Sequence, residues 1–254
     1  MHSDIWGSSR INNIYEARWF ITFIDDHTHV SWVYLLKEKS EAARKFQNFH
    51  KMIKTQFQAN SQILCTDNGR EYFSSILGSY LTNHWIVHYS SFVNTPQQNG
   101  IAERKNKHLL EVARALTFII ALPKPFWGET VLIATYLINR MPSRVLNFKT
   151  PLDTSKNSYP LSKLFCSLSP KVFGCVTFVH IHNQNQGKLD PRALRCVFLN
   201  FLLPKKVISV TILQLENFLC QWTLHFFRIL LSFPKLLFKG RLDMTKMRIC
   251  FGLL

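Results

Sequence analysis

Three acidic residues in the first half of the chain have the types and positions from which a metal-dependent site is built. Asp67 follows the short strand-like run 63–66, and Glu103 begins a helical pattern 36 positions later, while Asp4 is the candidate third ligand. Carboxylates on rigid elements share divalent cations, and two such cations activate an attacking oxygen and stabilise a leaving oxygen in phosphoryl transfer. Magnesium is the expected ion, since it prefers carboxylate and phosphate oxygens.

Two of these acids also have simpler structural roles. Asp67 begins an Asp-Asn-Gly turn, which an aspartate shapes with its own side chain. Glu103 lies in the first turn of its helix, where an acid complements the helix dipole. Residue type and spacing by themselves favour these structural roles over a metal site.

The elements around these residues predict a mixed α/β sheet covered by helices. Two runs of β-branched and aromatic residues, 18–24 and 30–36, flank a polar turn and predict a hairpin. Ser40 is expected to cap a helix with apolar residues at helical spacing, namely Ala43, Phe46, Phe49, Ile53 and Phe57. A strand at 63–66, a helix at 76–83, a strand at 86–89 and helices at 101–121 and 126–139 follow. Four tryptophans are assigned to the core, Trp19, Trp32, Trp85 and Trp127.

Changes in composition divide the chain further. Residues 1–145 form the predicted α/β domain, and the proline- and serine-rich stretch 146–170 is expected to be a linker. Strand-like runs at 172–181 and 195–201 fall in a second predicted unit, 171–201. Residues 202–254 show no clear amphipathic period, and we assign no element to them.

The charge balance favours an anionic partner. Lysine and arginine number 31 against 15 acidic residues, a formal net charge of +16, and each phosphate that a cation neutralises releases condensed counterions. The six cysteines lack both the short spacings of zinc sites and the density of disulfide scaffolds, so a reducing compartment is expected. No signal peptide or membrane span is predicted, because charged residues and a proline interrupt the most apolar stretch, 218–238.

Longer motifs resemble the integrases of copia-type retrotransposons. They are TDNGREY at 66–72, NTPQQNGIAERKN at 94–106, FIDDHTHVSWVYLLKEKSEA at 23–42 and YLINRMPS at 136–143. The 35 residues between Asp67 and Glu103 also match the D,D(35)E spacing of retroviral integrases. The resemblance covers about residues 2–200, a length that excludes chance similarity.

This resemblance implies an RNase H-like mixed sheet with flanking helices, followed by a truncated SH3-like small β-barrel. It also implies a DDE-type polynucleotidyl transferase that trims the DNA ends of the element and joins them to target DNA, a 3′-hydroxyl attacking a phosphodiester. Asp4, Asp67 and Glu103 would then bind two Mg²⁺ or Mn²⁺ ions. The first family carboxylate lies in an HSD motif, which assigns it to Asp4, with Asp25 or Asp26 as the rival.

The resemblance further assigns DNA contacts to the helix that carries the glutamate. The expected DNA-binding residues are Arg104, Lys105, Asn106 and Lys107. Lys107 lies one turn beyond Glu103, so an i,i+4 ion pair between the two is the alternative role. DNA as partner, self-association and a nuclear location are further implications of the family.

Two features depart from the family pattern. Only residues 1–3 precede Asp4, so the first strand is expected to be truncated and Asp4 to lie on a frayed terminus. The stretch 188–201, KLDPRALRCVFLNF, resembles the start of the barrel, and the similarity then stops. A shifted reading frame of 205–218 can spell KGYKCYNPTTRKF, which resembles the family continuation, so we expect a frameshifted tail at 202–254. The sequence therefore leaves two hypotheses, an active integrase and a catalytically inactive DNA-binding relic.

Overall fold

A computed structural model describes residues 1–91, 100–160, 162, 172–180, 193–202, 207–216, 223–232 and 249–251. The chain divides into two compact units, Met1–Ser167 and Leu168–Leu254. The boundary falls within the stretch expected to be a linker, 146–170, which also contains helix α5 (Pro151–Ser158). Residues 94–99 of the motif NTPQQNGIAERKN and residues 181–192 of the second predicted unit lie outside the described residues.

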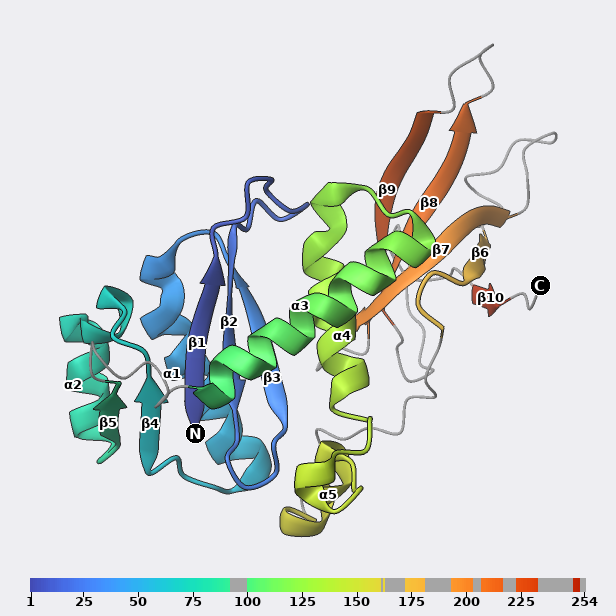
Figure 1. The fold of residues 1–254 in the computed structure, drawn as a ribbon. Helices are drawn as coiled ribbons and strands as arrows, with labels where there is room; N and C mark the ends of the chain where they lie inside the picture. Colours follow the sequence, from blue (N-terminus) through green and yellow to red (C-terminus); the bar gives the residue numbers. More distant parts are fainter. Residues whose placement is uncertain are drawn as a thin grey trace, which may run out of the picture. The chain divides into compact units, whose positions relative to one another are not determined.

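The first unit is built on a five-stranded mixed sheet with the order β3-β2-β1-β4-β5 (Figure 1). Its strands are β1 (His2–Gly7), β2 (Trp19–Ile24), β3 (Ser31–Leu36), β4 (Ile63–Thr66) and β5 (Val87–Ser90). Strands β1, β2 and β3 pair antiparallel, whereas β1 pairs parallel with β4, and β4 pairs parallel with β5. The predicted hairpin and the two following strands are therefore present at the expected positions.

Strand β1 lies in the centre of the sheet and does not end at Asp4. It pairs with β2 from His2 to Gly7, and on its other side His2 pairs with Cys65 of β4. The expectation that Asp4 lies on a frayed terminus was wrong, because the residues after Asp4, up to Gly7, continue the strand. Asp4 and the residues on either side of it, Ser3 and Ile5, all pair with β2, and this pairing fixes the backbone at Asp4.

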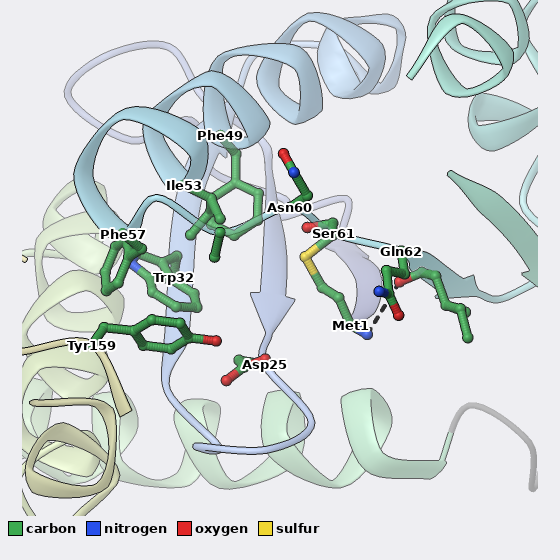
Figure 2. Close-up of a pocket in the computed structure, with 12 residues that line it drawn as sticks. Met1, Asp25, Trp32, Phe49, Ile53, Phe57, Asn60, Ser61, Gln62 and Tyr159 are labelled. Carbon is green, nitrogen blue, oxygen red and sulfur yellow. Dashed lines mark hydrogen bonds between the residues drawn. The ribbon is translucent and has the colours of Figure 1, made fainter. Parts of the chain in front are cut away.

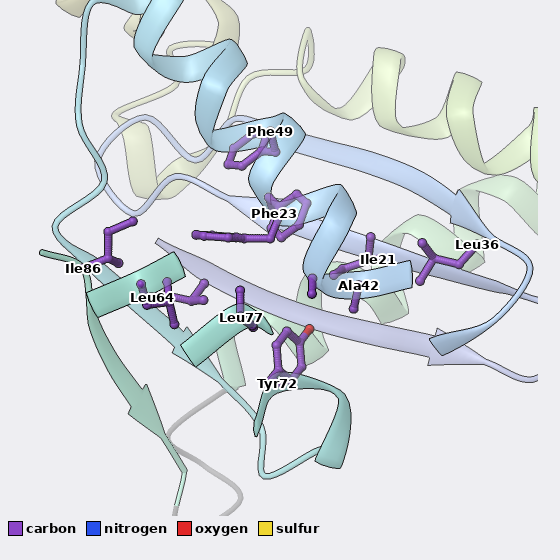
Figure 3. Packing of buried hydrophobic residues seen from close by; sticks show 12 residues of the cluster. Ile21, Phe23, Leu36, Ala42, Phe49, Leu64, Tyr72, Leu77 and Ile86 are labelled. Atoms are coloured by element: carbon purple, nitrogen blue, oxygen red, sulfur yellow. The ribbon is translucent and has the colours of Figure 1, made fainter. Parts of the chain in front are cut away.

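Helices cover both faces of the sheet, and the alternation of side chains along β2 explains why. Ile21 and Phe23 point to the face covered by α1 (Ala42–Phe57) and α2 (Ser75–Asn83), where they join a buried cluster (Figure 3). Phe20 points to the other face, where α3 (Gly100–Ile120) and α4 (Trp127–Ile138) form a second cluster. Both faces of β2 are buried, so its sequence WFITFI is nearly continuous in apolar residues.

The start of α1 and the position of one tryptophan differ from expectation. Ser40 lies in the 3-10 turn η1 (Lys39–Glu41), where its hydroxyl contacts the Glu38 carboxylate, so it does not cap α1. Trp85 is 90% exposed, whereas its neighbour Ile86 is 6% exposed. The chain turns sharply at Trp85, which has a left-handed φ of 56°, and this turn points Ile86 into the core in its place.

His50 of α1 joins the two helices on this face. Its Nδ1 atom lies 3.0 Å from the Tyr80 hydroxyl of α2, and its ring stacks on Phe46. Burial, followed by the charges of His84 and Lys54, lowers the pKa of His50 below its ordinary value of 6.5. The folded protein therefore keeps this ring neutral at pH values where the unfolded chain protonates it.

A loss of stability in mild acid follows from this lowered pKa. The contribution of a neutral His50 is present above the ordinary value of 6.5 and is lost as pH falls through the lowered folded pKa. We expect the Tm of the wild-type chain to fall further between about pH 7 and about pH 5 than the Tm of His50→Gln. Thermal unfolding followed by circular dichroism measures this, with the exposed His27→Gln as control. Equal losses in the wild type and His50→Gln would contradict the assignment.

The second unit is an antiparallel sheet with the order β10-β6-β7-β8-β9. Its strands are β6 (Val176–His180), β7 (Ala193–Leu202), β8 (Val207–Glu216), β9 (Thr223–Ser232) and β10 (Ile249–Phe251). Strands β8, β9 and β10 lie in the tail to which no element was assigned. The runs VISVTILQLE and TLHFFRILLS are rich in β-branched and aromatic residues, and this preference for strands outweighs the missing period. No helix in the described part of the chain is both long enough and apolar enough to span a bilayer.

Candidate active site beside two parallel strands

Asp4 of β1 and Asp67, the residue that follows β4, lie at matching levels of two adjacent strands. The parallel register pairs His2 of β1 with Cys65 of β4, and each aspartate follows its register residue by two positions. Side chains two positions apart point to the same face of a strand. The sheet thus sets both carboxylates beside one another, just past the point where the two strands stop pairing.

Helix α3 holds Asp4 from the face opposite α1. The Asn106 Nδ2 atom donates a hydrogen bond of 2.8 Å to Asp4 Oδ2, and Asn106 is only 4% exposed. The other side-chain atom of Asn106, Oδ1, is buried and has no hydrogen-bond partner among the described residues. Asn106 therefore orients Asp4 and leaves an unsatisfied acceptor next to it.

Glu71 is a fourth acid at this place, which the sequence interpretation did not select. The backbone N–H of Gly69 donates to Asp67 Oδ1 at 3.3 Å, and a side chain at Gly69 would meet the carboxylates of both Asp67 and Glu71 at about 3 Å. Glu71 accepts from Lys39 Nζ at 2.9 Å, and its side chain is 8% exposed. Its position inside the TDNGREY motif was the available signal, since it follows Asp67 by four residues in the turn η2 (Arg70–Phe73).

The protein alone disfavours ionisation of this pair of aspartates. Burial raises the pKa of Asp4 above its ordinary value, the Asn106 hydrogen bond opposes the rise, and the charges of Glu103 and Glu71 add to it. Burial and the charge of Asp4 likewise raise the pKa of Asp67. Carboxylates that repel one another in a partly buried place are stabilised by a bound cation, and such clusters concentrate at functional sites.

Glu103 stands at the side of this cluster. It is exposed in the first turn of α3, yet its charge contributes to the raised pKa of Asp4. No three aspartate, glutamate, histidine or cysteine side chains in the described part of the chain are arranged to hold a metal ion. The charges of Glu103 and Glu71 therefore both act on Asp4, while Glu103 itself is exposed in the first turn of α3.

Comparisons with known proteins show which sequences this chain is similar to. The chain is 37% identical over 201 residues to the retrovirus-related Pol polyprotein from transposon TNT 1-94 of Nicotiana tabacum, covering 79% of this chain and 15% of the relative. It is 34% identical over 204 residues to the corresponding polyprotein from transposon RE2 of Arabidopsis thaliana, covering 80% of this chain and 13% of the relative. The chain is related to a segment of copia-type retrotransposon Pol polyproteins. It spans about one seventh of the length of these relatives. No protein-family model matches it.

The three-dimensional comparison agrees with the fold expected of this Pol segment. The chain superposes with a TM-score of 0.50 and 15% identity on a chain of the simian T-cell lymphotropic virus intasome in complex with PP2A regulatory subunit B56 gamma. The match covers 85% of this chain and 73% of that chain. The expected RNase H-like mixed sheet with flanking helices is confirmed by this likeness together with the five-stranded mixed sheet of the first unit.

The rival carboxylates, Asp25 and Asp26, have other partners. Asp25 Oδ2 accepts from the backbone N–H and the hydroxyl of Thr28, and it lines a cavity of about 240 Å³ among aromatic rings such as Trp32 and Tyr159 (Figure 2). Asp26 lies 3.2 Å from the His2 ring and its side chain is 64% exposed. Neither rival carboxylate contacts Asn106, whereas Asp4 does.

The basic residues after Glu103 point in different directions. Lys107 is exposed, and the ion pairs within the described residues do not include a Lys107–Glu103 pair. Arg104 is exposed and its Nε donates to the Gly100 carbonyl at 2.9 Å. Lys105 is half-buried, and burial lowers its pKa. Arg104 and Lys107 are therefore accessible to a large anion, and Lys105 lies deeper.

Proposed function

We propose that this Pol segment is the catalytic core of an integrase, which joins the DNA ends of a retroelement to target DNA. The observation that carries the proposal is the placement of Asp4 and Asp67 at matching levels of adjacent parallel strands beneath Asn106. In the reaction, a DNA 3′-oxygen forms a bond to the phosphorus of a target phosphodiester, the hydroxyl loses its proton, and the bond to the leaving 3′-oxygen breaks.

The chemistry of the donor set fits a divalent cation. Asp4 and Asp67 supply the carboxylate oxygens that Mg²⁺ prefers, and Asn106 Oδ1 is a buried acceptor that a water of hydration would satisfy. Two bound Mg²⁺ or Mn²⁺ ions would activate the attacking hydroxyl and stabilise charge on the leaving oxygen. Glu103 would have to turn toward Asp4 to complete the ligand set, and its exposed position in the first turn of α3 leaves its side chain room to do so.

The chain's own residues would hold the substrate. Asn106 keeps the Asp4 carboxylate oriented through its 2.8 Å hydrogen bond. Arg104, Lys105 and Lys107 would bind DNA phosphates along α3, consistent with the net charge of +16. Self-association and a nuclear location belong to the same proposal, because integration joins two DNA ends to chromosomal DNA.

A disintegration assay tests the proposal, because it asks the core alone to reseal a branched DNA substrate with Mg²⁺ or Mn²⁺. We expect metal-dependent product from the wild-type chain and none from Asp67→Asn or Glu103→Gln. Glu111→Gln, an exposed acid two turns further along α3, is the matched control and should retain activity.

The second candidate function is a DNA-binding relic without catalysis, because the net charge of +16 would support DNA binding with or without the reaction. Folded protein that binds DNA and yields no product with either metal would support the relic and contradict the integrase proposal.

A further inference from the structure

A cavity of about 680 Å³ lies within the first unit, apart from the carboxylates. Three segments enclose it: the N-terminal half of α3, the turn that follows β2, and the stretch between α4 and α5, which includes the 3-10 turn η5 (Arg144–Leu146). Its volume falls in the range of ligand sites, roughly 300–1,000 Å³. Asp4, Asp67 and Glu103 are not among the described residues that line it.

Cations from two segments meet in this cavity. Arg104 and Lys105 come from α3, and Arg144 comes from η5. Two histidines, His29 and His108, add further nitrogen donors. The described lining includes no carboxylate, so the positive charge is not neutralised within the cavity. Such a concentration of cations attracts an anion.

Glu103, which precedes Arg104, and the two acids close to His29 in the chain do not line the cavity. Asp25 and Asp26 stand in the turn that precedes His29, but each has another partner. The Asp25 carboxylate accepts two hydrogen bonds from Thr28, at 3.0 Å and 2.6 Å. The Asp26 carboxylate lies 3.2 Å from His2, which does not line the cavity.

Lys105 is the group that most requires an anion. It is half-buried, burial lowers its pKa, and the ion pairs within the described residues do not include it. A partly buried ammonium without a counter-charge is costly, and a bound anion would offset that cost. Burial and the charge of Lys105 also lower the pKa of the neighbouring His29, and the charges of Asp26 and Asp25 oppose this without reversing it.

The rest of the wall is apolar, which indicates what the anion is attached to. Ile24, Ile101, Ile138, Met141 and Val145 line it. A small inorganic anion has no apolar surface that could pack against these side chains. The sugar of a nucleotide can pack against them while its phosphate contacts the cations. We propose that this cavity binds a backbone phosphate of DNA outside the catalytic carboxylates. The inference rests on the proposed function insofar as DNA is the substrate.

The salt dependence of DNA binding tests the proposal. Each phosphate contact to duplex DNA adds about 0.9 to the slope of log K against log salt. We expect Arg144→Glu to reduce this slope by about 1 and to weaken binding about 10-fold at low salt, measured by fluorescence anisotropy with a short duplex. Lys149→Glu is the matched control: Lys149 is exposed in the same segment and does not line the cavity, so the charge change is equal. An equal effect of both variants would overturn the proposal.

A second pair of variants guards against misfolding of the η5 segment. Arg104→Glu should reproduce the lower slope, and Arg114→Glu, also exposed on α3 but outside the cavity lining, should leave the slope unchanged. Chemical shifts of Lys105 and His29 should also move on titration with sodium tripolyphosphate and stay fixed with sodium chloride of equal ionic strength. If tripolyphosphate moves the chemical shifts of Lys105 and His29 while Arg104→Glu and Arg144→Glu leave the salt slope of DNA binding unchanged, the assignment of the anion to DNA is wrong.

The outcomes also separate this inference from the proposed function. The wild-type chain could yield disintegration product while Arg144→Glu leaves the salt slope of DNA binding unchanged. That result would contradict phosphate binding in the cavity and would support the integrase proposal. A reduced slope in a chain that yields no product would support the cavity and contradict catalysis.

Discussion

Asp4→Asn is expected to lower the rate of metal-dependent DNA resealing by about 100-fold or more. Loss of one metal-binding carboxylate removes several kcal/mol of transition-state stabilisation, and each 1.4 kcal/mol is about a factor of ten in rate. Single-turnover disintegration with Mg²⁺ measures the effect. Asp26→Asn is the matched control, since Asp26 is the exposed rival that contacts His2, and it should retain nearly full activity.

Asp4→Asn is also expected to leave the Tm unchanged or to raise it. Burial and the charges of Glu103 and Glu71 disfavour the ionised form of Asp4, so a neutral amide relieves a strain that exists without metal. The amide oxygen can still accept the hydrogen bond from Asn106 Nδ2. Lost activity with an intact Tm would therefore report chemistry and not unfolding. An active Asp4→Asn with an inactive Asp26→Asn would move the first ligand to the rival.

Phe23→Ala is expected to destabilise the first unit by about 3–5 kcal/mol, as large-to-small changes of buried aromatic residues do. Phe23 of β2 is fully buried between the sheet and α1, and its ring stacks on Phe49 at 4.5 Å and meets Phe46 edge-on. A domain with a total stability of about 5–15 kcal/mol would lose a large part of it.

Urea unfolding of the chain measures this loss of stability. Phe118→Ala removes the same side chain at a position that is 77% exposed, and its effect should stay within about 0.5 kcal/mol. Equal effects of the two substitutions would contradict the assignment of Phe23 to the central core.

The secondary structure of the first unit could largely be predicted from local sequence. The runs 18–24 and 30–36 form β2 and β3, and the helical pattern at 101–121 forms α3. These segments are long, and their apolar residues have the period of the element they form, so tertiary contacts reinforce the local preference. The prediction that Trp85 lies in the core was wrong, because the turn before β5 points Ile86 inward in its place.

The tail shows where periodicity misleads. Residues 207–216 and 223–232 lack a clear amphipathic period, yet they form β8 and β9. Backbone pairing with β7 and with each other supplies the order that the side-chain pattern does not, since a strand is completed by its neighbour. Single-segment patterns cannot contain that information.

The sequence by itself determined the acids, their spacing and the family they indicate, because these are properties of residue order. Only the tertiary structure decided which acids meet. The parallel register of His2 with Cys65 sets Asp4 beside Asp67, the Gly69 turn adds Glu71, and the charge of Glu103 acts on Asp4 from the start of α3. Register and side-chain direction arise from pairing between strands far apart in the chain, and for that reason the local HSD motif favoured Asp4 but left Asp25 and Asp26 as rivals.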